Sequence, residues 1–145
     1  MNKLRLGVIG LGAVVRDIYQ YLYYRSDFSH FLDVAGVADP NPAARQWFCE
    51  TFKFPAANAF ATHQELLQKV EFDVAQVNTP DTLHCGPAVD SMRAGRDVLV
   101  PKPTAATIRD AHTMIQTAKD TNRLLAVDFH KREDPRFKEA ESRYR

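Results

Sequence analysis

A single lysine, Lys102, stands between two prolines directly after the apolar run at residues 98–100. Pro103 biases Lys102 toward an extended backbone, so its side chain is aimed in one direction rather than free. An ammonium group in this position could hold a cofactor and a substrate at the end of a strand. The alternative is that Pro101 and Pro103 only turn the chain and that the lysine is solvated.

A second candidate is the glycine loop, in which Gly10 and Gly12 separate the apolar run 4–9 from a helical repeat. In a dinucleotide-binding fold the first glycine makes a tight turn, and the second lets the backbone approach a pyrophosphate at the helix N-terminus. Val15 replaces the third glycine of the pattern, which serves helix–strand packing more than phosphate contact. The loop predicts dinucleotide binding, and the alternative is a glycine turn without a ligand.

Asp39 follows the expected second strand, 31–38. The acid that binds the adenosine ribose of NAD occupies this topological place, usually about 20 residues after the glycine loop. Here the spacing is longer, which we attribute to a long first connection. A carboxylate at this position accepts hydrogen bonds from both ribose hydroxyls and repels a 2′-phosphate, so Asp39 favours NAD over NADP. The alternative is a turn aspartate, since Asp39 precedes Pro40.

The bulk composition excludes several classes of protein. The chain has 145 residues, of which 45% are hydrophobic and 26% charged, with a formal net charge of +1. These values suit one soluble domain and give neither a nucleic-acid footprint nor a membrane-surface patch. No apolar stretch reaches the roughly 18 residues of a transmembrane helix. Two cysteines without C-x-x-C spacing favour a reducing compartment, so we expect a cytoplasmic protein, and the five histidines form no metal-binding cluster.

Strand-like and helix-like segments alternate along most of the chain. This order predicts an α/β fold: a doubly wound, mostly parallel sheet with helices on both faces, because parallel strands need crossover connections. Two capping boxes, beginning at Thr62 and Thr107, mark helix starts. The expected strands are 4–9, 31–38, 73–77, 97–100 and 124–127, and the other expected helices are 43–52 and 82–94.

The most informative stretch is "VNTPDTLHCGPAVDSMRAGRDVLVPKPTAATIRDAHTMI". It resembles the Gfo/Idh/MocA family of the glucose–fructose oxidoreductase and inositol dehydrogenase type. The resemblance rests on Thr79-Pro80, on His84 four residues after the proline, on the approach 94–98 to the next strand, and on Pro101-Lys102-Pro103. "VDFHKREDPRF" also looks like the family's segment after the sixth strand. The resemblance extends from about residue 3 to the end of the chain.

The resemblance implies a two-domain oxidoreductase. Residues 1–130 would form a Rossmann domain that holds NAD, with NADP less expected, and residues 131–145 would begin a crossover helix toward a C-terminal α/β domain that this chain lacks. The substrate would be the hydroxyl of a sugar, inositol or related polyol, held mainly by that second domain. This chain alone would then bind cofactor without turning over substrate. The apolar surface left exposed would drive self-association, so we expect a homo-oligomer that contacts neither nucleic acid nor membrane.

The resemblance also assigns roles to single residues. Lys102 matches the lysine of the family's E-K-P motif, which reaches the nicotinamide ribose and the reacting hydroxyl, and is the expected catalytic residue. Its ammonium would stabilise charge that develops on the hydroxyl as hydride leaves the carbon. Pro101 stands where the family has glutamate, which puts the nicotinamide pose in doubt. The expected cofactor-binding residues are Gly10, Leu11, Gly12, Ala13, Val14, Asp39, Asn78, Thr79, Pro80, His84 and Lys102.

Several alternatives remain open at this stage. His84 could instead be a surface or capping histidine, and Cys85 fits a small buried hydrophobe. His130, Lys131 and Arg132 could hold the cofactor, a substrate acid or only solvent, with solvent ranked first for Lys131. The whole protein could be an NAD-dependent glycosidase-type relative or a non-catalytic nucleotide-binding module. The resemblance also raises the odds of a cis Lys102–Pro103 bond above the ordinary frequency of about 5–6%.

Overall fold

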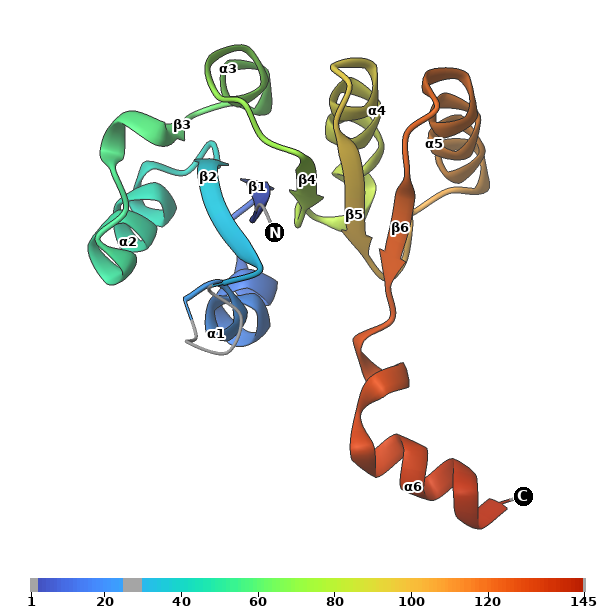
Figure 1. The fold of residues 1–145 in the computed structure, drawn as a ribbon. Helices are drawn as coiled ribbons and strands as arrows, with labels where there is room; N and C mark the ends of the chain where they lie inside the picture. Colours follow the sequence, from blue (N-terminus) through green and yellow to red (C-terminus); the bar gives the residue numbers. More distant parts are fainter. Residues whose placement is uncertain (1–2, 25–29, 145) are drawn as a thin grey trace.

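A six-stranded parallel sheet organises the chain in the computed structural model, which describes residues 3–24 and 30–144 (Figure 1). The strand order is β3-β2-β1-β4-β5-β6, and every neighbouring pair is parallel. The predicted parallel sheet is therefore confirmed. The strands are β1 (Leu4–Ile9), β2 (Leu32–Ala38), β3 (Ala59–Phe60), β4 (Val74–Val77), β5 (Asp97–Pro101) and β6 (Leu125–Asp128).

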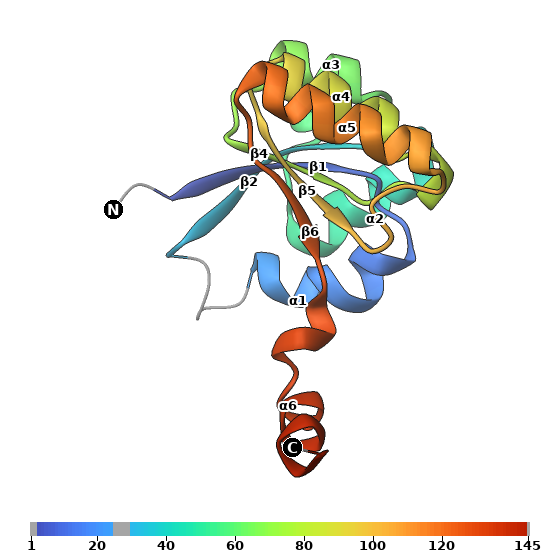
Figure 2. The ribbon, with the colours of Figure 1, turned by 90° about the vertical axis from the view of Figure 1, so that its right-hand side faces the viewer.

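Helices cover both faces of the sheet, as the doubly wound prediction requires. Figure 2 shows α3, α4 and α5 on one face and α1 and α2 on the other. The helices are the π-helical turn η1 (Val15–Tyr19), α1 (Gln20–Tyr23), α2 (Pro42–Phe52), α3 (His63–Lys69), α4 (Cys85–Arg93), α5 (Ile108–Thr121) and α6 (Pro135–Tyr144), with short 3-10 turns η2 (Ala56–Asn58), η3 (Asp81–Leu83) and η4 (His130–Glu133).

Local chemistry places the helix starts. Thr62 forms the predicted capping box with Glu65 ahead of α3, and the Thr107 side chain accepts a hydrogen bond from the Asp110 amide ahead of α5. Asn41 caps α2, which has Pro42 in its first turn. The expected helix 82–94 is instead the 3-10 turn η3 followed by α4. The predicted elements are thus observed with small boundary shifts, and the short strand β3 was not predicted.

The helix after the glycine loop departs from regular α-helix. It is π-helical from Val15, the position where the dinucleotide pattern has its third glycine, and the Val15 side chain is fully buried. We attribute the wider turn to this side chain, which a glycine would lack. Two buried phenols fix the helix to the sheet: Tyr19 donates to Asp128 Oδ2 (2.5 Å) and Tyr23 to Gln76 Oε1 (2.8 Å). Burial raises the pKa of both phenols, so both stay protonated donors.

Two apolar clusters, one for each face, form the core. One gathers side chains from the central strands with Leu66, Met92 and Met114 of α3, α4 and α5. The other packs the glycine-loop helix and α2 against the opposite face, around Phe48. Both faces of the central strands β1 and β4 are covered by helices, so the carboxyl ends of these two strands are held firmly in place.

The last segment stands apart from the sheet. In both views α6 projects away from the other elements, and none of its residues is buried (Figures 1 and 2). The boundary after residue 130, with residues 131–145 beginning a helix that leads away, stays a prediction. No helix among the described residues is both long and apolar enough to span a membrane.

Gly10 lies at the tightest point of the fold. Its φ is +90°, and a Cβ there would lie 2.8 Å from the main-chain carbonyl atoms of Asn78. We expect Gly10→Ala to destabilise the chain by about 1–3 kcal/mol, the cost of a strained backbone conformation, measured by urea unfolding. Gly12→Ala is the matched control, because a Cβ at Gly12 meets no atom within 4 Å. Equal stability of the two variants would contradict this account.

Candidate active site

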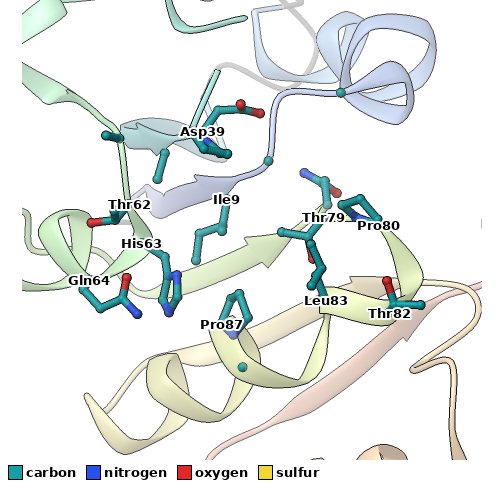
Figure 3. Close-up of a pocket in the computed structure, with 17 residues that line it drawn as sticks. Ile9, Asp39, Thr62, His63, Gln64, Thr79, Pro80, Thr82, Leu83 and Pro87 are labelled. Atoms are coloured by element: carbon teal, nitrogen blue, oxygen red, sulfur yellow. The ribbon is translucent and has the colours of Figure 1, made fainter. Parts of the chain in front are cut away.

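The carboxyl ends of β1, β2 and β4 surround a cavity of about 680 Å³ (Figure 3). The strand order reverses between β1 and β4, and ligands of open α/β sheets bind at such a switch point. In Figure 3, Asp39 lies over the ends of β1 and β2, His63 and Gln64 lie at one side, and Thr79 and Pro80 at the other. The cavity therefore lies at the strand ends where the sequence predicts dinucleotide binding.

The glycine loop forms one wall of this cavity. The Gly10 amide donates to the Ala38 carbonyl (2.7 Å), which ties the loop to the end of β2. Gly12 faces open space, so a ligand can approach its backbone directly. Leu11 turns its side chain into the core, where it is fully buried, and lines no cavity. Its amide rather than its side chain faces the strand ends.

Asp39 links the loop to the end of β2. Its Oδ2 accepts the Leu11 amide (2.7 Å) and its Oδ1 accepts the Asn41 amide (2.8 Å). The carboxylate also lines the cavity. Because each carboxylate oxygen can accept two hydrogen bonds, ribose hydroxyls can donate to Asp39 without breaking these contacts. The turn interpretation and the ligand interpretation of Asp39 are thus compatible.

A second cavity, of about 540 Å³, continues the first past the end of β4. Both are lined by Gly12, Asn78, Thr79 and Pro80. The second is also lined by Ala13, Val14, Ile18, Asp81, Pro101, Lys102 and Lys131. The two cavities form one crevice, which runs from the end of β2 across the glycine loop to the end of β5.

Asn78 lies at the centre of this crevice with unmet polar groups. It is 5% exposed, and neither its side-chain oxygen nor its nitrogen has a partner among the described residues. The Thr79 hydroxyl is unpartnered as well. Buried polar atoms are nearly always hydrogen-bonded, so these groups call for a polar ligand or water. Together with the open face of Gly12 and the Asp39 carboxylate, they fit a dinucleotide.

Lys102 reaches the second cavity from the end of β5. It is exposed, and its peptide bond to Pro103 is cis. Pro101, where the resemblance expects glutamate, lines the same cavity, so an apolar ring stands where that carboxylate would be. The crevice therefore has an ammonium at this end without the acid expected to accompany it.

His84 lines neither cavity and is fully buried. Its Nε2 lies 2.8 Å from the Thr79 carbonyl, and its Nδ1 lies 3.1 Å and 3.2 Å from the carbonyls of Pro103 and Thr104. The ring joins the end of β4 to the turn that follows Lys102. The surface interpretation is wrong, and His84 occupies the N-cap position of α4 without making a side-chain capping hydrogen bond. Any effect of His84 on a cofactor passes through the segments it joins.

Among the cavity residues that were not anticipated as site residues are three polar ones at the start of α3. Thr62, His63 and Gln64 follow β3 and line the first cavity, and His63 Nε2 lies 2.9 Å from Asp90 Oδ2. The capping box at Thr62 predicted where the helix starts, but it did not predict that this start lies at the strand ends that line the cavity. Because β3 has only two residues, no periodicity reveals that this helix begins at the strand-end edge.

Neither cysteine has the surroundings of a reactive thiol. Burial, with Asp110 nearby, raises the pKa of Cys85, whose Sγ lies 3.8 Å from the Asp110 carbonyl. Burial also raises the pKa of Cys49. Within residues 3–24 and 30–144, no group of three or more His, Cys, Asp or Glu side chains could hold a metal ion.

His84→Ala should lower the free energy of unfolding by about 1–3 kcal/mol, because buried carbonyls lose their partner. It should also broaden the amide NMR signals of Lys102 and Thr104, since the turn loses its tie to β4. His112→Ala, at an exposed position of α5, is the matched control. If the two variants unfold at the same urea concentration, the ring does not carry this role.

Comparisons with known proteins agree with this geometry. Residues 4–129 match the model of the GFO_IDH_MocA oxidoreductase family, NAD-binding Rossmann fold. D-glucoside 3-dehydrogenase of Escherichia coli K12 is 32% identical over 132 residues, which cover 90% of this chain and 36% of that protein. A scyllo-inositol 2-dehydrogenase (NADP(+)) of Bacillus subtilis is 34% identical over 87 residues, covering 60% of this chain and 26% of that protein.

Solved structures share the fold. Apo scyllo-inositol dehydrogenase from Lactobacillus casei superposes with a TM-score of 0.84 at 17% identity, covering 97% of this chain and 40% of that one. The WlbA dehydrogenase from Bordetella pertussis, solved with NADH and UDP-GlcNAcA, gives 0.82 at 23% identity over 92% of this chain and 39% of that one. The matched part of this chain makes up between 26% and 40% of these proteins. It belongs to the Gfo/Idh/MocA oxidoreductase family and forms its NAD(P)-binding Rossmann domain.

Proposed function

We propose that the crevice binds NAD with the adenosine ribose at Asp39 and the nicotinamide half toward Lys102. The observation that carries this proposal is the continuity of the two cavities, which share the glycine loop and the end of β4. The proposed contacts are those expected from the sequence: Gly10, Gly12, Ala13 and Val14 along the pyrophosphate, and Asn78, Thr79 and Pro80 beside the nicotinamide half. Leu11 and His84 contribute by holding Asp39 and the Lys102 turn.

The whole protein would transfer hydride between the nicotinamide and a hydroxyl of a sugar, inositol or related polyol. The names of the relatives, a glucoside and an inositol dehydrogenase, support this substrate class. A bound nicotinamide supplies the hydride acceptor. Lys102 then serves as the catalytic residue, because its ammonium stabilises the negative charge that develops on the substrate oxygen.

Two groups at the end of β2 bear on the choice between NAD and NADP. The Asp39 carboxylate repels a 2′-phosphate and so favours NAD. Arg45, whose Nη1 donates to the Asp39 carbonyl (2.6 Å), is the cation that could accept such a phosphate. We infer that Asp39 decides, because its carboxylate lines the cavity whereas Arg45 does not.

A non-catalytic nucleotide-binding module is the second candidate. Pro101 in place of the expected glutamate favours it, since the lysine then lacks the acid that accompanies it at the cofactor. The two candidates share the crevice and the cofactor, and they differ in whether hydride moves.

We further propose a cytoplasmic homo-oligomer without nucleic-acid or membrane partners. Cys49 and Cys85 are both free thiols, which suits a reducing compartment. Large apolar side chains, among them Ile108 and Leu124, are 79% and 64% exposed, which supports a further covering surface.

Asp39→Asn tests the cofactor preference. Calorimetric titration of the unchanged chain should show tighter binding of NAD than of NADP. The variant should lose at least about tenfold of this preference, because a like-charge contact with the 2′-phosphate disappears while the amide oxygen still accepts the Leu11 amide. Asp33→Asn, an equal charge change at the exposed start of β2, should bind as the unchanged chain does. Equal affinities for the two cofactors before mutation would remove the role given to Asp39.

The 145-residue chain should bind NAD without producing NADH from sugars or polyols. Hydride transfer requires a substrate carbon held against the nicotinamide and a base for the hydroxyl proton. This chain spans little more than a third of a relative such as D-glucoside 3-dehydrogenase, which is about two and a half times as long. An absorbance screen for NADH, run beside the calorimetry, measures both properties. Steady NADH production by this chain would show that its own residues suffice.

A further inference from the structure

Three cations converge at the end of the crevice beyond the glycine loop. Lys102 follows β5, while Lys131 and Arg132 lie in η4 after β6. The two strands leave the sheet side by side, because Pro101 pairs with Asp128. Lys102, Lys131, Arg132 and Phe129 surround a cavity of about 260 Å³. We refer to Lys102, Lys131 and Arg132 as the basic cluster.

No carboxylate lines the cavity that the basic cluster surrounds, although Asp81 lines the neighbouring cavity with Lys102 and Lys131. Glu141 lines a separate cavity with Lys131 and Arg132, and none of the ion pairs identified between described side chains joins a carboxylate to the cluster. Asp128 accepts the Tyr19 hydroxyl. Asp134, which lies within electrostatic reach of Lys131, is paired with Arg136 at 2.7 Å. Gathering like charges costs free energy, which a bound anion would recover.

Aromatic rings hold two of the three cations in place. The Arg132 guanidinium lies 4.6 Å from the centre of the Phe129 ring, and Lys131 Nζ lies 5.2 Å from that of Phe137. These contacts restrain long side chains that would otherwise disperse into solvent. A guanidinium beside two ammonium groups suits a carboxylate or a phosphate, because its planar fork can bind two oxygens of one oxyanion.

We propose that the basic cluster binds an oxyanion on the substrate, so that the substrate is a sugar acid or a sugar phosphate rather than a neutral polyol. This inference rests on the proposed function and narrows its substrate class. Lys102 and Lys131 also line the neighbouring cavity, which reaches the glycine loop. The oxyanion is therefore held next to the lysine assigned to the reacting hydroxyl, and Lys131 has a role besides solvation.

The cofactor pyrophosphate is the other oxyanion within reach of Lys131. Gly12, Ala13 and Val14 line the cavity that it shares with Lys102. The smaller cavity contains none of these loop residues, which favours the substrate as the source. The two sources differ in one measurable respect: only the pyrophosphate makes NAD affinity depend on Lys131 and Arg132.

The test is an amide NMR titration of the 145-residue chain at constant ionic strength, with and without saturating NAD. The probes are D-glucuronate and D-glucose 6-phosphate, with neutral D-glucose as their counterpart. Both anions should cause saturable shifts centred on Lys102, Phe129 and Lys131, and D-glucose should not. Lys131→Gln and Arg132→Gln should each weaken anion binding about two- to fivefold, as for a partly exposed ion pair. Lys119→Gln, an equal charge change on α5, should not.

The remaining outcomes distinguish a failure of the oxyanion site from a failure of the proposed NAD-binding function. Equal responses to the anions and to D-glucose, or equal weakening by Lys119→Gln, would overturn the oxyanion site. Loss of NAD affinity in Lys131→Gln with unchanged glucuronate binding would overturn it in favour of the pyrophosphate. Anion binding at the cluster in a chain that fails to bind NAD would support the site and refute the proposed function instead.

Discussion

The close passage of Gly10 beside the end of β4 is the constraint on which the site depends. The Asn78 amide donates to the Ile9 carbonyl and the Gly10 amide to the Ala38 carbonyl, both at 2.7 Å. These bonds hold β1 between its neighbours up to its last residue, and only a glycine at φ +90° can then turn the chain without striking Asn78. Because the turn is this tight, Gly12 faces the crevice and the Leu11 amide reaches Asp39. One backbone contact thus positions the glycine loop, the Asp39 carboxylate and the unpartnered side-chain amide of Asn78 together.

At the other end of the crevice, the buried His84 ring fixes the position of the chain in a similar way. His84 faces carbonyl oxygens from the end of β4 and from the turn after Lys102, and carbonyl oxygens only accept hydrogen bonds. Each contact is therefore a hydrogen bond when the facing nitrogen carries the proton. Through these contacts, Lys102 leaves the sheet at a position set by β4 as well as by its own strand. The two ends of the crevice are linked through residues 78–84.

Site residues that are recognisable from their neighbours in sequence could be predicted, and those brought to the site only by the packing of distant segments could not. Gly10, Gly12 and Asp39 were found because a turn next to a strand end restricts residue type, and the parallel sheet followed from alternating segments. His84 was ambiguous, since a buried histidine and a surface histidine have the same neighbours in sequence. His63 was missed because β3 is two residues long. Lys131 was ranked first as solvated, because its approach to Lys102 comes from the pairing of β5 with β6, which the sequence does not show.

The crevice is electrostatically asymmetric, and this asymmetry gives a ligand a direction. A carboxylate, Asp39, lies at one end, whereas at the other end two ammonium groups, Lys102 and Lys131, outnumber the single carboxylate of Asp81. Hydroxyl groups can donate to the acid, whereas oxyanions are repelled from it and attracted to the cations. A dinucleotide satisfies both ends only when its adenosine ribose lies at Asp39. In the proposed binding mode, the field that orients the cofactor would also leave net positive potential beside the reacting carbon, where it would stabilise an oxygen that gains negative charge and draw in a substrate that already carries one.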